Sequence, residues 1–173
     1  KPIQLGRDVF VHKVLGRETI AQAIKILEGF QELLSAWSIA QKDLFIIATS
    51  AIREARNRDT FLDRVYIKTG LRIRIVDGVE ENHLTYIAVL HAVGELQSAF
   101  ARTASIIMEV GSGSTELMIM DRGKMVAAHL YRLGTLRLDT QTGQRSAELL
   151  DRSIEDLFRS TLDGLRAEFN MNR

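Results

Sequence analysis

The chain has 173 residues, of which 46% are hydrophobic and 26% are charged, a balance typical of one globular domain, or of a small domain with part of another. It has no cysteine, which excludes disulfides, thiolate metal sites and cysteine nucleophiles, and which fits a reducing cytoplasm. The net charge of +1 argues against nucleic-acid binding, and no apolar run approaches the roughly 20 residues that cross a membrane. No signal-peptide pattern opens the sequence. We therefore expect a cytoplasmic protein without nucleic-acid or membrane partners.

The first forty residues predict an extended segment followed by a long helix. Residues 4–15 carry valines and a phenylalanine among polar side chains, which favours extended structure. Thr19 and Gln22, three positions apart, are typical of a capping box at the start of a helix. Apolar residues then recur every three or four positions up to Trp37, so we expect one buried helix face, with Trp37 packed in the core or at its rim.

Two short strands and a second helix are predicted next. Residues 43–49 form an apolar run typical of a buried strand, and residues 72–76 alternate charged residues with isoleucines as a strand does. Between them, residues 58–69 predict a helix that ends at Gly70. The inward side chains of this helix are predicted to be Phe61, Leu62 and Val65.

The second half of the chain has a different pattern of elements. A helix is predicted from Glu80 to about residue 100, and a tight turn is predicted at residues 122–124. Three consecutive strands are predicted over residues 105–110, 116–121 and 125–133, and a final helix over residues 146–169. This order of elements predicts an α/β fold. The change of pattern near Gly78 predicts a boundary between residues 1–78 and 79–173.

The loop between the first two of these three strands is the most informative local feature. Residues 111–115, Gly-Ser-Gly-Ser-Thr, lack the lysine of a Walker phosphate loop, and a strand rather than a helix is predicted after them. A glycine-rich hairpin of this kind allows backbone N–H groups to surround a phosphate, with hydroxyls on Ser112, Ser114 and Thr115 as further donors. The alternative interpretation is a flexible hairpin turn without a ligand.

Two acids flank the loop. Glu109 stands among apolar strand residues and Glu116 follows Thr115 directly. A carboxylate in such surroundings is costly unless it has a partner, and oxygen ligands of this kind suit Mg²⁺ beside a phosphate. The alternative is a solvent-exposed strand end. The four histidines show no metal-ligand spacing and are expected to be packing or surface residues.

Four blocks of the sequence together resemble the exopolyphosphatase / guanosine-pentaphosphate phosphohydrolase family. Residues 48–57 (A-T-S-A-I-R-E-A-R-N) are similar to the family signature A-T-S-A-x-R-x-A-x-N, and residues 78–84 to its S-G-x-E-E-A-R-L. Residues 109–117 (E-V-G-S-G-S-T-E-L) resemble D-I-G-G-G-S-T-E-L, and residues 132–138 resemble L-G-x-x-R-L. The blocks appear in the family's order over about 140 residues.

The resemblance implies a fold, a reaction and a set of site residues. The fold is a two-lobed, actin-like α/β architecture, of which residues 1–78 are the C-terminal portion of lobe I and residues 79–173 the N-terminal portion of lobe II. Glu81 is implied as the catalytic base, although an acid at the start of a helix also interacts favourably with the helix dipole. The other implied roles are Mg²⁺ binding by Glu109 and Glu116, and phosphate binding by Arg53, Gly111, Ser112, Gly113, Ser114 and Thr115.

The implied reaction is hydrolysis of the terminal phosphoanhydride of inorganic polyphosphate, or removal of the 5′-phosphate of guanosine pentaphosphate in the bacterial stringent response. Hydrolysis of this kind needs positioned water and neutralised charge rather than covalent catalysis. The sequence does not distinguish the two substrates. The full-length protein is a candidate homodimer.

The sequence also departs from the family pattern. Glu109 replaces an aspartate, Ser112 replaces a glycine, and Asn82 and His83 replace Ala-Arg. The family's N-terminal phosphate loop is not in the sequence, so we expect a piece of a longer protein that is inactive alone. The alternative function is a catalytically degenerate regulatory domain that binds a nucleotide or polyphosphate without hydrolysing it. A pure interaction scaffold leaves the loop and its acids unexplained.

Overall fold

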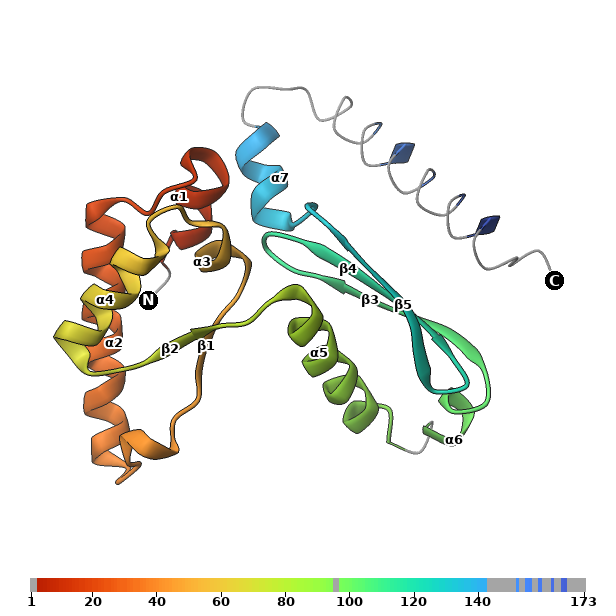
Figure 1. The fold of residues 1–173 in the computed structure, drawn as a ribbon, viewed down its shortest axis with the longest axis horizontal. Helices are drawn as coiled ribbons and strands as arrows, with labels where there is room; N and C mark the ends of the chain where they lie inside the picture. Colours follow the sequence, from red (N-terminus) through yellow and green to blue (C-terminus); the bar gives the residue numbers. More distant parts are fainter. Residues whose placement is uncertain are drawn as a thin grey trace. The chain divides into compact units, whose positions relative to one another are not determined.

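The computed structural model describes residues 3–94 and 97–142, with a few separate positions between 152 and 167. Residues 1–137 form one compact unit and residues 138–173 form a second one. All residues that build the candidate site lie in the first unit, so the fold is described for that unit (Figure 1). The helix predicted over residues 146–169 falls largely outside the described residues. The boundary predicted near Gly78 stays a prediction.

The N-terminal part of the first unit contains two short parallel strands and several helices. In chain order its elements are α1 (Leu5–His12), α2 (Arg17–Ala36), a 3₁₀ turn (Gln41–Asp43), β1 (Ile46–Ala48), α3 (Ser50–Glu54), α4 (Arg58–Thr69) and β2 (Ile73–Ile75). The strands pair in register from Ile46 opposite Ile73 to Ala48 opposite Ile75. Figure 1 shows α2 and α4 side by side, and both contribute to one apolar core.

The prediction of an extended segment over residues 4–15 is wrong, because residues 5–12 form helix α1. Gly6, Val9 and Phe10 share one face of this helix and are buried, so its apolar residues follow the helical period after all. The capping box at Thr19 is also wrong. Helix α2 begins at Arg17, and the N–H of the preceding Gly16 donates to Asp8 Oδ2 at 2.8 Å.

The buried strand predicted over residues 43–49 is corrected to residues 46–48, with Ile47 47% exposed, whereas the predicted helix is confirmed. Helix α4 spans the predicted residues and ends at Gly70 with φ of +69°. Phe61 and Val65 are buried as predicted, and Leu62 is partly buried against the same core. In contrast, the end of α2 is open to solvent, with Trp37 70% exposed. The buried face of α2 is therefore confined to its first half.

The remaining elements are helices and an antiparallel meander: α5 (Gly78–Ala92), α6 (Gln97–Phe100), β3 (Ala104–Val110), β4 (Thr115–Asp121), β5 (Lys124–Tyr131) and α7 (Thr135–Thr142). The single helix predicted up to residue 100 is corrected to two, with Gly94 at φ of +48° after α5. The three strands are confirmed. Arg122 and Gly123 both have positive φ, which is typical of the type I′ turn of a two-residue hairpin.

The meander is the framework of the candidate site. Its strand order is β3-β4-β5, and the central strand β4 is buried from Thr115 to Met120. Helix α5 lies beside this sheet in Figure 1. Its residues Tyr86 and Val89 pack against the apolar cluster that contains Ile107 and Met118. None of the helices in the described residues is long and apolar enough to span a membrane.

Candidate active site

A small pocket of about 120 Å³ collects residues from the start of α3, from α5 and from the β3–β4 hairpin. Glu81 comes from the first turn of α5, Glu109 from the end of β3 and Glu116 from the start of β4. The lining residues are Thr49, Ser50, Glu81, Glu109, Gly111, Ser112, Gly113, Ser114 and Glu116. Most of the residues predicted from the sequence thus surround one pocket.

The glycine-rich loop is held from one side by the residues that precede and begin α7. The backbone N–H groups of Leu136 and Arg137 both donate to the carbonyl of Ser112 at 3.0 Å, and the N–H of Thr135 donates to the carbonyl of Gly111 at 3.0 Å. A trans peptide holds its carbonyl and the following N–H on opposite sides. The N–H groups of Ser112 and Gly113 therefore point away from the start of α7 and are available to an anion.

Two glycines are required by the close packing around this loop. A Cβ on Gly134 would lie 2.3 Å from the backbone of Ser112 and Gly113. A Cβ on Gly113 would lie 2.4 Å from the ring of Phe10 and 2.6 Å from Ser50 Oγ. A side chain at Gly134 would displace the loop backbone, and one at Gly113 would displace the ring of Phe10 and the hydroxyl of Ser50. The loop is therefore packed closely against its surroundings.

Glu109 and Glu116 are direct cross-strand partners in the β3–β4 ladder. Side chains directly opposite each other lie on the same face, with Cβ atoms about 4.5–5.5 Å apart, and like charges in this arrangement are destabilising. The carboxylate of Glu109 accepts a hydrogen bond from the hydroxyl of Thr85 on α5. Glu116 differs, since neither of its carboxylate oxygens has a hydrogen-bond partner among the described residues.

The environment of Glu116 opposes its ionisation. Its exposed fraction is only 2%. Burial, together with the negative charges of Glu81 and Glu109, raises the pKa of Glu116 from 4.5 to about 7, and the positive charge of Arg53 opposes this only in part. A buried carboxylate without partners, beside two further acids, is the donor set that a divalent cation would complete. Among the described residues, however, no group of three or more acids or histidines has the geometry of a metal site by itself.

Glu81 and Glu80 are neighbours in sequence but have different partners. The side chain of Glu81 lines the pocket and accepts a hydrogen bond from Arg53 Nη1 at 2.8 Å, and the same guanidinium nitrogen donates to the carbonyl of Val76. Glu80 pairs with Arg74 at 2.5 Å. The N-cap residue Asp77 accepts the N–H of Glu80 at 2.8 Å and fixes the start of α5. The helix start thus presents one of its two glutamates to the pocket.

Two predicted phosphate ligands are placed differently from the rest. Arg53 contacts Glu81 rather than lining the pocket, and Thr115 donates its hydroxyl to the carbonyl of Leu133 at 2.5 Å. Their contact with phosphate stays a prediction.

Sequence reasoning missed the hydroxyls of Ser50 and Thr85, although Ser50 lies inside the signature of residues 48–57. It also missed the role of Arg137 behind the loop, which lies in the block of residues 132–138.

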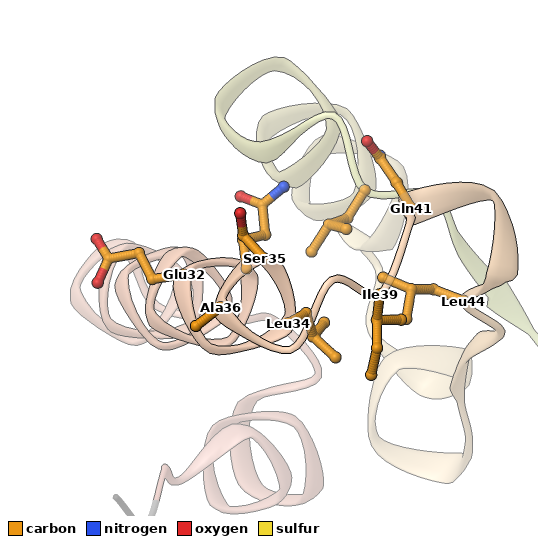
Figure 2. Close-up of a pocket in the computed structure, with 9 residues that line it drawn as sticks. Glu32, Leu34, Ser35, Ala36, Ile39, Gln41 and Leu44 are labelled. Carbon is orange, nitrogen blue, oxygen red and sulfur yellow. The ribbon is translucent and has the colours of Figure 1, made fainter.

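A larger hollow lies elsewhere in the unit and lacks this chemistry. It has a volume of about 760 Å³ near the end of α2 and is lined mainly by apolar and uncharged residues, among them Leu34, Ile39 and Leu44. Figure 2 shows that its single acid, Glu32, points away from Ile39 and Leu44. Chemistry rather than size therefore identifies the candidate site.

Known proteins are similar to this chain in sequence and in fold. A model of the Ppx/GppA phosphatase family matches residues 2–165. The chain is 27% identical over 139 residues to the bifunctional 3-dehydroquinate synthase/phosphatase of Fusobacterium nucleatum, covering 79% of this chain and 20% of that protein. It is 36% identical over 103 residues to exopolyphosphatase 1 of Mycobacterium leprae, covering 59% of this chain and 29% of that protein.

A solved structure of an exopolyphosphatase from Cytophaga hutchinsonii superposes with a TM-score of 0.72 at 20% identity, over 98% of this chain and 53% of that one. The chain thus spans only part of the length of these relatives, from a fifth to about half. The predicted α/β fold of the actin-like type is confirmed by this likeness. The match of the family model over nearly the whole sequence shows that the chain belongs to the Ppx/GppA phosphatase family.

Proposed function

We propose that the whole protein carrying this chain hydrolyses the terminal phosphoanhydride bond of inorganic polyphosphate, or the 5′-phosphate of guanosine pentaphosphate, in the presence of Mg²⁺. The observation that carries the proposal is Glu116, a buried carboxylate without partners beside a glycine-rich loop that holds its N–H groups away from α7. A carboxylate of this kind is costly in the free protein. Its retention next to an anion-binding loop is explained by a cation that accompanies phosphate.

The two cross-strand acids fit a divalent cation. Glu109 and Glu116 would hold Mg²⁺ between them, with bound phosphate supplying further oxygen ligands. When bound, the cation supplies neutralisation of the charge on the phosphoryl oxygens. Two protein carboxylates are enough for this role, because Mg²⁺ usually keeps several waters and substrate oxygens as ligands.

The glycine-rich loop supplies the second source of neutralisation. The N–H groups of Ser112, Gly113 and Ser114 would donate to the terminal phosphate, and the hydroxyl of Ser50 lies close to Gly113 in the same pocket. Donors that are fixed before the substrate arrives do not reorganise during the reaction, which is why such sites stabilise developing charge well. Phosphoryl transfer relies on this kind of positioning more than on covalent chemistry.

Glu81 would act on the attacking water. Arg53 engages Oε2 of Glu81, and no partner for Oε1 is found in the described part of the chain. In the proposed step the water oxygen bonds to phosphorus as the bond to the bridging oxygen breaks, and Glu81 accepts a proton from the water. The products are orthophosphate and a chain shorter by one phosphate. Arg53 orients the base and supports its negative charge until it accepts the proton.

A second candidate function, a sensor that binds polyphosphate or a nucleotide without cleaving it, is favoured by one feature. The side chain of Ser112 lies in the loop where a glycine stands in the family pattern, and the pocket is only about 120 Å³ in volume. A side chain at this position restricts the approach of the phosphate. Such a restriction is more harmful to an in-line transition state than to ground-state binding.

The test is phosphate release by the whole protein, offered polyphosphate and guanosine pentaphosphate separately, with and without Mg²⁺. We expect Glu81→Gln to reduce the rate by at least about a hundredfold, the typical contribution of a positioned base. Glu80→Gln is the matched control, since this neighbour pairs with Arg74 outside the pocket and its substitution should leave the rate unchanged. Binding of either compound without phosphate release by the unsubstituted protein would favour the sensor.

A further inference from the structure

Arg137 is a buried arginine directly behind the glycine-rich loop. Its exposed fraction is 3%, and its Nε donates to the carbonyl of Gly113 at 2.6 Å. Its backbone N–H donates to the carbonyl of the preceding loop residue, Ser112. One residue therefore holds two consecutive carbonyls of the loop, one through its main chain and one through its side chain.

Glu54, at the end of α3, holds the other end of the guanidinium. Arg137 Nη2 donates to Glu54 Oε1 at 2.5 Å, while Lys13 and Arg132 approach Glu54 Oε2 at 3.4 and 3.6 Å. Burial alone would raise the pKa of Glu54, but the hydrogen bond and charge of Arg137, with the charges of Arg132 and Lys13, bring it below the ordinary 4.5. The carboxylate is thus kept ionised as the anchor of Arg137.

The face of the guanidinium is also covered. Phe10 on α1 lies under Arg137 with 4.1 Å between the ring centroid and Cζ, and the same ring fills the space beside Gly113. Stacking on an aromatic ring and hydrogen bonding in the guanidinium plane together fix the side chain in three dimensions. A buried cation that served only to neutralise Glu54 would not need this orientation.

We propose that Arg137 is a positioning residue that locks the peptide between Gly113 and Ser114, so that the loop presents amide N–H groups rather than a carbonyl oxygen to phosphate. Glu54 and Phe10 hold Arg137 in place for this purpose. Rotation of that peptide would direct the Gly113 carbonyl toward the pocket, where it would repel an anion. The effect on phosphate rests on the proposed function, whereas the effect on the loop does not.

Lysine is the informative substitution at this position. Its ammonium is a single point charge, whereas the guanidinium fork bonds Gly113 and Glu54 at once and stacks on Phe10. Arg137→Lys therefore keeps the positive charge but loses the combined contacts that fix the peptide. We expect the affinity for orthophosphate in the presence of Mg²⁺ to fall about tenfold to a hundredfold, the equivalent of one or two steps of ~1.4 kcal/mol.

The experiment uses amide NMR spectra of the chain, first without ligand and then with orthophosphate and Mg²⁺. In Arg137→Lys the amide signals of Ser112, Gly113 and Ser114 should shift and exchange faster with solvent. Arg137→Ala should show the same change, and added methylguanidinium should reverse it by occupying the vacated site. Val65→Ala is the matched control, because it opens a cavity in the core on α4 without touching the loop.

The outcomes separate this proposal from the proposed function. Loop amides in Arg137→Lys that coincide with wild type, or that move as much in Val65→Ala, would overturn the positioning role. If Arg137→Lys does not fold, Glu54→Gln replaces it, with a smaller shift of the same amides expected and an absent shift equally decisive. The loop amides could respond as expected although the protein does not bind orthophosphate. This result would support the positioning role and refute the phosphate site.

Discussion

Two glutamates lie near the glycine-rich loop, and their surroundings differ in charge. Glu54 has Lys13, Arg132 and Arg137 within 3.6 Å, and these cations hold its pKa below 4.5. Glu116 has no hydrogen-bond partner among the described residues, and burial, together with the charges of two further acids, raises its pKa to about 7. Burial favours a raised pKa at both carboxylates, so the cations around Glu54 account for the opposite direction of its shift.

The difference is one between a charge with cationic partners and a charge without hydrogen-bond partners among the described residues. The neighbouring cations offset the charge of Glu54, and this cluster holds the loop in place. The Glu116 side is incomplete, because Glu116 faces the like-charged Glu109 across β3 and β4 and has no hydrogen-bond partner among the described residues. Arrangements of this kind are costly for folding and are retained at sites where a ligand supplies the missing charge. The comparison therefore predicts opposite effects when each acid is neutralised.

Neutralising Glu116 should have the largest effect. In the whole protein we expect Glu116→Gln to lower Mg²⁺-dependent phosphate release by about a hundredfold, since a ligand of the cation is lost. In the metal-free chain at pH 8 the same substitution should raise the free energy of unfolding by about 1–2 kcal/mol, because wild type must ionise a buried group there. Phosphate release and denaturant unfolding in the presence of a chelator measure the two effects.

The pH dependence of this gain has a definite sign. The folded protein binds a proton at Glu116 more tightly than the unfolded chain, so this group favours folding below pH 4.5 and the benefit disappears as pH rises to about 7. The stabilisation by Glu116→Gln should therefore be small at pH 5 and full at pH 8. Asp121→Asn, at the exposed end of the same strand, is the matched control. An equal increase in the free energy of unfolding at both pH values would show that the ionisation of Glu116 does not destabilise the folded protein.

The sequence predicted the strands and the loop of this site because their signals are local. The residues of β3 and β4 and the glycines between them are contiguous, and the turn at Arg122 and Gly123 has a recognisable composition. The grouping of Glu81 with Glu109 and Glu116 was available only from the family resemblance, since an acid at a helix start has an ordinary structural explanation. The roles of these acids stay predictions.

The features that the sequence did not predict depend on contacts between distant segments. Nothing local distinguishes Arg137 from a surface arginine, because its burial is set by Glu54, 83 residues earlier, and by Phe10. Helix α1 was missed because valines and a phenylalanine favour strands, although its buried residues follow the helical period and the helix packs against α3. Thr85 was missed because its partner Glu109 comes from another element.

Neutralising Glu54 should have a moderate effect of the opposite sign. We expect Glu54→Gln to lower the free energy of unfolding at pH 7 by about 1–2 kcal/mol, the range for hydrogen bonds with a charged partner. Because the pKa of Glu54 is lowered on folding, its contribution is present above pH 4.5 and is lost as pH falls through the lowered value. The deficit of the variant should therefore shrink in acid, where urea unfolding can follow it.

An exposed ion pair provides the control for Glu54. Glu80 pairs with Arg74 at 2.5 Å, but the arginine side chain is 61% exposed. Glu80→Gln should therefore cost less than about 1 kcal/mol at pH 7. If both substitutions lower the free energy of unfolding equally, the cluster around Glu54 stabilises the protein no more than a surface ion pair does. The contrast between Glu54 and Glu116 would then not hold for Glu54.

The smallest expected effect concerns Thr85, the one described side chain that donates to the acids Glu109 and Glu116. Its hydroxyl fixes the carboxylate of Glu109, so Thr85→Val removes this bond at nearly constant volume. The Mg²⁺ concentration for half-maximal phosphate release should rise about threefold to tenfold, the effect of one lost hydrogen bond behind a metal ligand. The maximal rate should change little, because Glu81 and the loop are untouched.

Thr103→Val, which removes a hydroxyl bonded to the carbonyl of Ala99 on the exposed surface, should change neither quantity. An unaltered Mg²⁺ requirement in Thr85→Val would mean that Glu109 does not need this support. Glu116 would then remain the single acid whose surroundings call for the cation.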